Sequence, residues 1–319
     1  MQRRHLLACA LPVLTPLLAR AQTPLRIITT DQPGGGMDAL LRPMADRLAQ
    51  NLGRPVLVEN RPGAQGRIGG QAAVASPPDG NTLLATVQAG IVINPQAYAN
   101  WPYDTRQDLL PVTDMGRGSL LLLTPGSAPA SDFADFVRWL KTQPAGSVSY
   151  GTYGLGTISH FGGVLLAQSL GVDMTPVHYK ASGDQVKDLA GGQVAWGWGP
   201  AAGAIAQLVK AGRLKALAYL GPQRLPAFPD VPTIRELGHA GVEMDGWIGV
   251  FAPRGTPAEA VARHQQEIAK VLALPAIREM YLGFGFAPGG GTPAEFAQLV
   301  QADWQRFGAS IRQIGYKPD

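Results

Sequence analysis

Short apolar runs and helix-like patterns alternate along the first part of the chain. Apolar runs at 25–30, 55–59 and 82–86 each predict a strand. Between them, residues 38–52 carry apolar side chains at the i, i+4, i+8 spacing of a helix, and 68–75 predicts a shorter helix. Strands that alternate with helices are typical of an α/β lobe with a mainly parallel sheet.

The alternation begins again after residue 119 and predicts a second α/β lobe. We expect strands at 119–124, 147–151, 174–178, 194–198 and 214–220, with helices at 131–142, 156–170, 183–190 and 200–211. A Pro-rich connection at 222–232 leads to a strand at 247–252 and to helices at 257–273, 275–282 and 293–313. This order fits a second lobe inserted into the first. We therefore expect lobe 1 to comprise 22–122 and 221–319, and lobe 2 to comprise 123–220.

Residues 1–21 differ from the rest and predict a secretory signal peptide. Arg3 and Arg4 precede an apolar run at 6–19, and Ala19-Arg20-Ala21 forms a small-x-small cleavage signal. The apolar run is too short to span a membrane and contains two prolines. The peptide predicts export, while the Sec and twin-arginine routes both stay open.

The charge of the chain changes once this peptide is removed. The whole sequence has 27 Lys and Arg against 23 Asp and Glu, a net charge of +4, but three of the arginines belong to the peptide. The near-neutral remainder shows no block of like charges, which argues against nucleic-acid binding. Cys9 is the single cysteine, so a disulfide framework and a cysteine-ligated zinc cluster are excluded.

The first glycine-rich turn follows the strand predicted at 25–30. Gly34, Gly35 and Gly36 would expose backbone N–H groups at the start of the next helix, where the helix dipole favours an anion. Such a turn suits a carboxylate or a phosphate. The alternative is a tight connection in which Asp38 caps its own helix, and the two can coexist.

The second glycine-rich turn, at 151–160, again lies between a predicted strand and a predicted helix. Gly154 and Gly156 allow close approach of a ligand, and Thr152 and Thr157 offer hydroxyl donors. The turn does not match a dinucleotide fingerprint because Ser159 stands where a third glycine is needed. His160 is more typical of a buried or helix-capping histidine than of a ligand.

Signatures of catalysis and of metal binding are missing from the sequence. It contains neither a nucleophile elbow nor a His-Glu-x-x-His motif, and its acids form no cluster with metal spacing. The histidines after the signal peptide are scattered, at positions 160, 178, 239 and 264. We therefore predict a protein without catalytic residues, bound metal or cofactor.

Ten motifs in a fixed order carry a family resemblance. They are Pro33-Gly34-Gly35-Gly36-x-Asp38, Val56-x-Val58-Glu59-Asn60-Arg61-Pro62-Gly63-Ala64, Pro77-x-Asp79-Gly80-x-Thr82-Leu83-Leu84, Ile93-Asn94-Pro95, Pro102-Tyr103-Asp104, Gly154-x-Gly156-Thr157-x-x-His160, Tyr179-Lys180, Gly191-Gly192-Gln193-Val194, Ala211-Gly212-Arg213-Leu214-Lys215-Ala216-Leu217-Ala218 and Pro229-Asp230-Val231-Pro232-Thr233. Together they resemble the extracytoplasmic solute receptors of tripartite tricarboxylate transporters, the Bug receptors, over essentially the whole mature chain.

The resemblance implies an α/β periplasmic binding protein of type II, with two lobes that are joined by a hinge and close on a small ligand. It implies a periplasmic receptor for a carboxylate or an amino acid, with membrane transporter subunits as partners. A monomer is the simplest expectation for a receptor that diffuses. A sensory receptor for a membrane kinase is the alternative, and a periplasmic enzyme is a third class. The implied ligand-binding residues are Gly34, Gly35, Gly36, Asp38, Gln88, Ala89, Gly90, Thr152, Gly154, Gly156, Thr157 and Lys180.

Three departures from the family pattern bear on the ligand. Asp31 stands where relatives usually have an aromatic or apolar residue, so it would repel a dicarboxylate or attract an ammonium group. Trp196 and Trp198 lie in a segment that usually carries two acids. They would line the pocket or pack in the core, and strand alternation favours the core. His178 replaces a usual proline.

Overall fold

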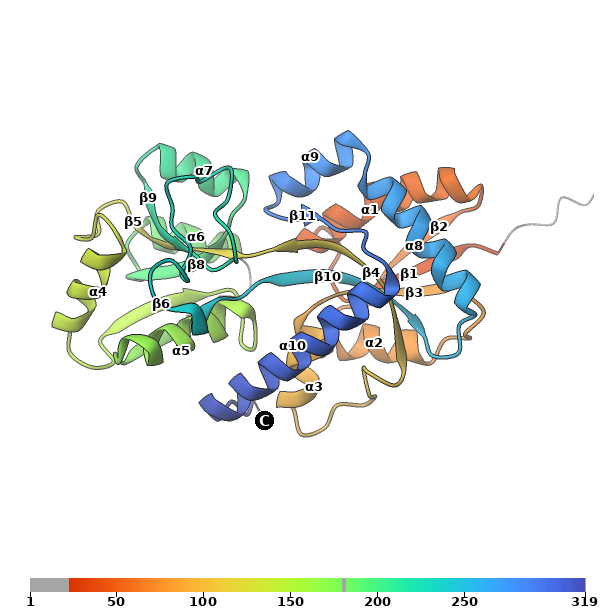
Figure 1. Ribbon diagram of the computed structural model, residues 1–319, viewed down its shortest axis with the longest axis horizontal. Coiled ribbons are helices and arrows are strands. Elements are labelled where there is room, and N and C mark those ends of the chain that lie inside the picture. The colour runs from red at the N-terminus through yellow and green to blue at the C-terminus, as the bar shows by residue number, and fades with distance from the viewer. Residues whose placement is uncertain (1–22, 180–181, 319) are drawn as a thin grey trace, which may run out of the picture.

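The computed structural model describes residues 23–179 and 182–318, so the predicted signal peptide and Lys180 lie outside the described residues. The molecule has two lobes, each built on its own sheet with helices packed against it (Figure 1). This architecture confirms the predicted two-lobed α/β class. Among the helices of the described part, none has the length and apolar character that crossing a membrane requires.

The first sheet has the strand order β11-β4-β10-β3-β1-β2. Its strands are β1 (Leu25–Thr29), β2 (Val56–Asn60), β3 (Thr82–Val87), β4 (Leu109–Gly118), β10 (Gly246–Pro253) and β11 (Ala287–Pro288). β1 pairs in parallel with β2 and β3, as predicted, but β10 runs antiparallel to both β3 and β4. The expectation of a mainly parallel sheet is therefore wrong here, because β4 leaves the lobe and β10 returns to it.

The second sheet has the order β7-β6-β8-β5-β9. Its strands are β5 (Leu120–Pro125), β6 (Val148–Thr152), β7 (Met174–His178), β8 (Trp196–Pro200) and β9 (Leu214–Tyr219). β6 is parallel to β7 and β8, whereas β5 is antiparallel to β8 and β9. Leu120 already pairs in this sheet, which lies close to the boundary that we predict between the lobes.

Helices cover the sheets of both lobes. Against the first sheet and its margin lie α1 (Gly36–Leu52), η1 (Ala64–Gly66), α2 (Arg67–Val74), η2 (Ala89–Ile93), α3 (Asn94–Ala97), α8 (Ala258–Leu272), α9 (Pro275–Gly283) and α10 (Pro293–Ile314). The second lobe carries α4 (Phe133–Thr142), α5 (Ile158–Leu170), α6 (Ser182–Ala190), α7 (Gly203–Lys210) and η3 (Ala240–Val242). Most predicted helices are present, but α5 begins two residues later than predicted.

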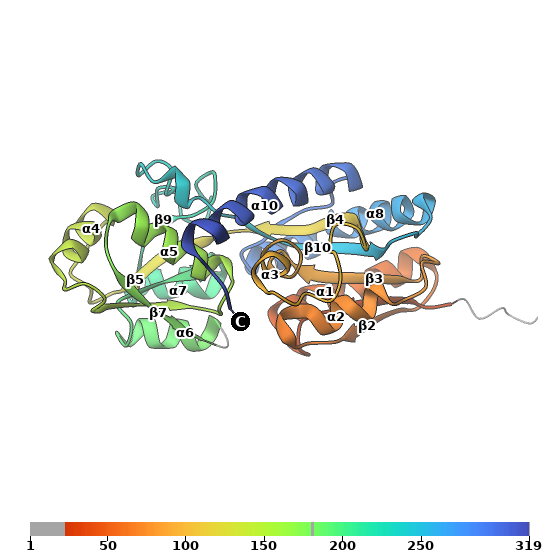
Figure 2. The same ribbon diagram turned by 90° about the horizontal axis from the view of Figure 1, so that it is seen from below.

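The chain crosses between the sheets in two places, and α10 forms a third connection. Ser119 alone separates β4 from β5, and its hydroxyl donates to the backbone oxygen of Met244, which lies just before β10. α10 extends from the first lobe to α5, as both views show (Figures 1 and 2). There Gln313 Nε2 donates to Gln168 Oε1 at 3.0 Å.

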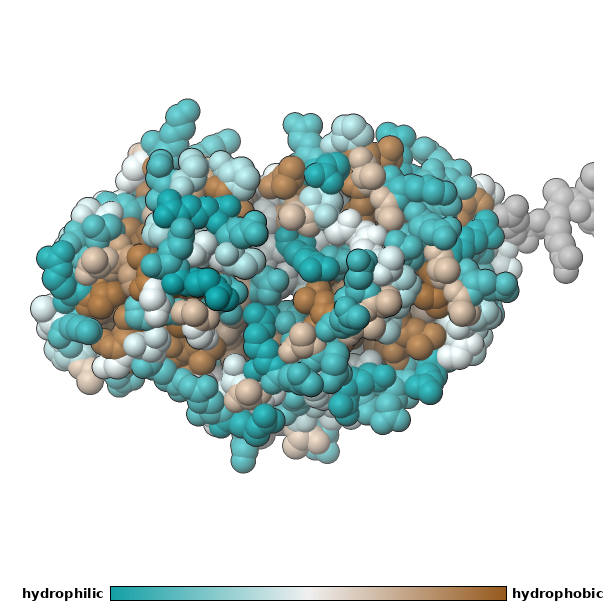
Figure 3. All heavy atoms as spheres, viewed as in Figure 1, coloured by the Kyte–Doolittle hydropathy of each residue, from teal (hydrophilic) through white to brown (hydrophobic). Residues whose placement is uncertain are grey.

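A continuous core extends through the second lobe and into the first. Phe161 on α5 and Phe307 on α10 belong to it, with ring centroids 6.0 Å apart. Trp196 and Trp198 are both fully buried in this core, which confirms core packing as their role. In contrast, the face of the molecule seen in Figure 3 is mostly hydrophilic and is indented between the two lobes.

Replacement of Trp196 by alanine tests this packing. The ring stacks on Tyr150 at a centroid distance of 4.7 Å. Since truncating a buried aromatic side chain leaves a cavity, we expect Trp196→Ala to lower the free energy of unfolding by about 3–5 kcal/mol. Leu57→Ala, at a position that is 51% exposed, serves as the control and should stay within about 0.5 kcal/mol. Urea unfolding measures both, and a loss below about 1 kcal/mol for Trp196→Ala would contradict the packing argument.

Candidate ligand-binding cleft

A cavity of about 450 Å³ lies between the two lobes. The first lobe contributes the turn after β1 and the end of β3, and the second lobe contributes the start of α5. The crossing segments and residues 284–286 complete the walls. The cavity is lined by Thr30, Asp31, Gly36, Met37, Val87, Gln88, Ala89, Gly118, Ser119, Leu120, Tyr153, Thr157, Ile158, Pro200, Gly246, Trp247, Ile248, Phe284, Gly285 and Phe286. This is the place where the carboxyl ends of strands β1 and β3 meet helix N-termini.

The turn between β1 and α1 contains an acceptor from the chain itself. Asp31 Oδ2 accepts hydrogen bonds from the backbone N–H groups of Met37 at 2.9 Å and Asp38 at 3.1 Å. Gly34 adopts φ 77°, a left-handed conformation that glycine favours. Gly35 is the N-cap of α1, and Gly36 lines the cleft. The predicted anion position at this helix is therefore filled by the Asp31 carboxylate.

Asp38 lies beside this turn and is 2% exposed. Its carboxylate accepts hydrogen bonds from the Gly34 N–H at 2.9 Å, Arg42 Nε at 2.8 Å and Asn60 Nδ2 at 2.8 Å. Burial alone would raise the pKa of Asp38, but these three donors outweigh it and hold the pKa below its ordinary value. Asp38 thus fastens the glycine turn to α1 and β2.

Gln88 follows β3 at the floor of the cleft and is 2% exposed. Its Nε2 donates to Asp303 Oδ2 at 2.6 Å and to the backbone oxygen of Asp245 at 3.2 Å. Among the described residues, its Oε1 has no hydrogen-bond partner. Trp247 Nε1 also donates to Asp303 Oδ2, at 2.8 Å. Burial raises the pKa of Asp303, and its hydrogen-bond donors only partly oppose that effect.

The neighbours of Gln88 differ in their position. Ala89 lines the cleft, whereas Gly90 is buried, and a Cβ at position 90 would lie 3.0 Å from Thr86 Oγ1. Among the candidates in this segment, Gln88 and Ala89 therefore face the cavity. Gly90 allows the chain to pack closely behind it.

The second glycine turn is partly turned away from the cavity. Thr152 is fully buried, and its hydroxyl is bonded to His178 Nδ1 at 2.7 Å. Gly154 and Gly156 both have positive φ, of 135° and 72°. A Cβ on Gly156 would lie 2.8 Å from the Tyr316 hydroxyl, so this glycine accommodates the C-terminal segment. Of the second-lobe candidates that the structure describes, Thr157 is the one that lines the cleft.

The start of α5 leaves donors free. Thr157 Oγ1 donates to the Gly154 backbone oxygen at 2.8 Å, and no side chain caps the helix. Within the described part of the chain, the backbone N–H groups of Ile158 and Ser159 have no acceptor. Ile158 also lines the cavity. A helix N-terminus with free N–H groups at a cavity wall favours an anionic group.

His160 lies on the first turn of α5, is 7% exposed and accepts a hydrogen bond from the Gly156 N–H at Nδ1, at 3.3 Å. Its ring is 5.0 Å from that of His178. Burial, together with the neighbouring His178, lowers the pKa of His160 to about 4. His160 is thus a buried, neutral histidine at the start of a helix, as the sequence predicts.

Several lining residues were not predicted from the sequence. They come from the crossing segments, such as Ser119 and Trp247, and from Phe284 and Phe286. The apolar run at 120–123, which directly follows Gly118-Ser119, is the pattern that could have indicated a strand crossing between lobes. No pattern in the sequence around Phe284 and Phe286 indicates that these two residues lie at the cleft.

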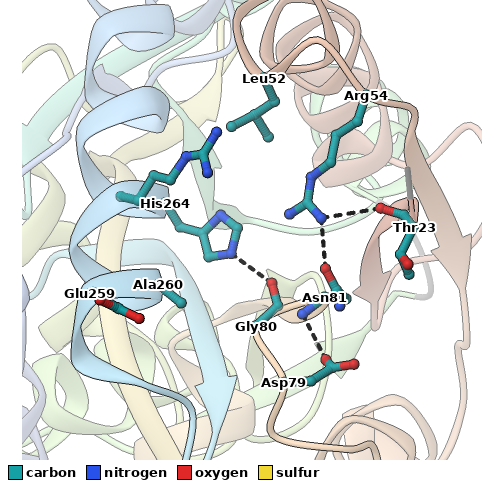
Figure 4. A pocket seen from close by; sticks show the side chains of 10 residues that line it. Thr23, Leu52, Arg54, Asp79, Gly80, Asn81, Glu259, Ala260 and His264 are labelled. Atoms are coloured by element: carbon teal, nitrogen blue, oxygen red, sulfur yellow. Dashed lines mark hydrogen bonds between the residues drawn. The ribbon is translucent and has the colours of Figure 1, made fainter. Parts of the chain in front are cut away.

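A larger cavity, of about 590 Å³, lies at the opposite edge of the first sheet, where β1 and β3 begin (Figure 4). Arg54 donates to Thr23 O at 3.1 Å and to Asn81 Oδ1 at 2.6 Å, and His264 Nε2 lies 2.8 Å from the Gly80 oxygen. This cavity is lined by none of the residues that the sequence predicts to bind a ligand.

In the described ranges, 23–179 and 182–318, no group of three His, Cys, Asp or Glu could hold a metal ion.

Comparison with known protein families identifies one that spans most of the chain. The family model described as "Tripartite tricarboxylate transporter family receptor" matches residues 40–316. The protein BugT of Bordetella pertussis is 32% identical over 295 residues, which cover 92% of this chain and 90% of BugT. A UPF0065 protein from the tcbD-tcbE intergenic region of Pseudomonas sp. strain P51 is 32% identical over 313 residues, or 96% of this chain and 92% of that protein.

Solved structures with the same fold include two with bound dicarboxylates. An R. palustris protein solved with adipate has a TM-score of 0.81 and 30% identity, and the match covers 93% of this chain and 99% of that protein. MatC from Rhodopseudomonas palustris, solved with malate, has a TM-score of 0.77 and 27% identity over 90% of this chain and 98% of MatC.

The lowered pKa of His160 predicts how stability depends on pH. Since the ordinary pKa is 6.5 and the native one is about 4, the native state binds this proton less tightly than the unfolded chain. The neutral form of His160 makes its full contribution to the free energy of unfolding above pH 6.5. This contribution is lost as the pH falls toward 4, by up to about 3 kcal/mol. We expect His160→Asn to flatten urea stability curves between these pH values. His239→Asn, at a partly exposed histidine, is the control. Equal slopes for wild type and His160→Asn would refute the argument.

Proposed function

Because the chain belongs to the receptor family of tripartite tricarboxylate transporters, we propose that it captures a small carboxylate-bearing ligand between its lobes and delivers it to the membrane subunits of such a transporter. The family consists of periplasmic solute-binding receptors, which are not enzymes. The observation that carries the proposal is the cleft, whose walls come from both lobes and include the uncapped start of α5.

In this proposal, the ligand carboxylate binds at the start of α5. The free N–H groups of Ile158 and Ser159 supply the donors, and the helix dipole adds a partial positive charge. Adipate and malate, the ligands in two similar structures, both carry carboxylates. Gly36, Gln88, Ala89 and Thr157 are then contact residues. Gly34, Gly35, Asp38, Gly90, Thr152, Gly154 and Gly156 instead shape the turns that hold them.

Closure of the lobes follows from the way in which they are connected. Ser119 lies between β4 and β5, and β10 begins at Gly246, so both crossings border the cleft. We place the hinge at these crossings; the first is near the predicted boundary at 122, whereas the second, at Gly246, lies about 25 residues after the predicted boundary at 221. A ligand that contacts both lobes binds the closed form more tightly and shifts the population toward it.

A thermal-shift panel tests the ligand class. The mature chain from Gln22 is melted with mono-, di- and tricarboxylates, aromatic acids and amino acids. A ligand at 100 times its dissociation constant stabilises by about 2.7 kcal/mol, which raises the melting temperature by several degrees. A folded, ligand-free protein that responds to none of these compounds would count against the receptor function. Copurification with a membrane kinase, and not with transporter subunits, would contradict delivery to a transporter.

Replacement of Ile158 by proline tests the carboxylate position. Proline removes the N–H but suits the first helical position, as Pro275 in α9 and Pro293 in α10 do. Thr157 is extended, so it tolerates a following proline. Since a hydrogen bond to a charged group contributes about 1.5–3 kcal/mol, we expect affinity to fall at least about tenfold. Ile158→Val, which keeps the N–H, is the matched control. Calorimetry that finds equal affinities for both variants would place the carboxylate elsewhere.

A further inference from the structure

The first-lobe wall of the cleft presents acceptors where a carboxylate ligand would need donors. Two N–H groups in the first turn of α1, those of Met37 and Asp38, are bonded to Asp31 Oδ2. The other carboxylate oxygen, Oδ1, accepts the Gln32 N–H at 3.0 Å. An anion at a helix N-terminus uses such N–H groups. The Asp31 side chain therefore occupies the position that a ligand carboxylate would take at α1.

The backbone is shaped around this carboxylate. A Cβ on Gly35 would lie 2.3 Å from Asp31 Oδ2, so any other residue at position 35 would displace the side chain. Gly34, with its positive φ, turns its N–H toward Asp38 Oδ2 and not toward the cleft. Asp31 itself remains a lining residue of the cavity. Its negative charge is thus held at the cleft wall by the geometry of the turn.

Gln88 adds a second acceptor to the same wall. Its Nε2 is held between the Asp303 carboxylate and the Asp245 carbonyl. A flipped amide would set its oxygen against both of these acceptors, so the orientation is determined. Oε1 is then left without a donor among the residues that the structure describes. A buried acceptor without a partner is unfavourable, and a donor on a ligand would satisfy it.

The opposite wall has the reverse character, because the start of α5 offers free N–H groups. The rest of the lining is mainly apolar and includes Met37, Val87, Leu120, Ile248, Phe284 and Phe286. The cleft therefore combines donors on the second-lobe wall with a carboxylate and an unpartnered amide oxygen on the first-lobe wall. A dicarboxylate matches only one of these walls.

We propose that Asp31 makes the cleft selective for zwitterions. On the premise of the receptor function proposed above, the ligand carries a carboxylate for the start of α5 and a protonated amine for Asp31 and Gln88. An apolar body joins the two groups, as in an ω-amino acid. A second carboxylate in place of the amine would face the charge of Asp31 and bind more weakly.

Matched ligand pairs test the proposal on the wild-type mature chain. Each pair differs only in an ammonium group that replaces one carboxylate: 4-aminobutanoate with glutarate, 5-aminopentanoate with adipate, and 6-aminohexanoate with pimelate. Titration calorimetry at neutral pH should show at least about tenfold tighter binding of the amine in the pair that binds best. A wild-type preference for the dicarboxylate would overturn the inference while leaving the receptor function intact. If neither member of any pair binds, the inference fails, whereas the receptor function fails only if the wider thermal-shift panel also gives no response.

Asp31→Asn then assigns the preference to this side chain. The amide keeps an acceptor for the N–H groups of α1 but removes the charge, so the preference for the amine should fall at least about tenfold. Asp132→Asn is the matched control, because Asp132 Oδ1 caps α4 by accepting the Asp135 N–H at 2.8 Å, outside the residues that line the cleft. An Asp31→Asn protein that melts cooperatively and keeps the wild-type preference would overturn the role of Asp31.

Discussion

The antiparallel pairing of β4 with β10 is the constraint on which the rest of the structure depends. β4 carries the chain out of the first sheet and continues, after Ser119, as the strand β5, which pairs with β8 and β9 in the second sheet. Because β10 also pairs with β3, the end of β3 is held beside Trp247, whose backbone oxygen accepts the Gln88 N–H at 2.9 Å. A register shift between Ile248 and Gly249 leaves Met115 of β4 as an extra residue, so the irregularity lies in β4, beside the lining residue Ile248. The floor of the cleft is therefore part of the connection between the lobes.

The two helices that point at the cleft show that equal topology does not give equal chemistry. Both α1 and α5 follow a strand and a glycine-containing turn. In α1 a carboxylate from the turn satisfies the N–H groups, whereas in α5 the nearby side chains bond to each other and to the turn, as Thr157 does with Ser159. The electrostatic difference between the walls thus comes from where one acidic side chain falls relative to a helix start.

Much of the fold could be predicted from the sequence, because β1, β2 and β3 are short apolar runs between helices with clear spacing. The antiparallel strands were harder to predict. Their direction depends on a crossing between lobes, and local periodicity does not report it. In the candidate site, the glycine turns were recognisable from the sequence. The position of the Asp31 carboxylate at the start of α1 was not, because it depends on how the turn directs the N–H groups of Met37 and Asp38. The approach of Tyr316 to Gly156 joins segments 160 positions apart, beyond any local pattern.

The third connection, through α10, limits the paths along which the lobes can move. Two adjacent strands alone would form an axis about which the lobes turn freely. α10 lies off that axis and is anchored on both sides, by Asp303 and Arg306 near the floor of the cleft and by Phe307 and Gln313 against α5. Any wide separation of the lobes must break this contact or carry the end of α10 along with α5. The helix therefore resists a simple opening of the two lobes.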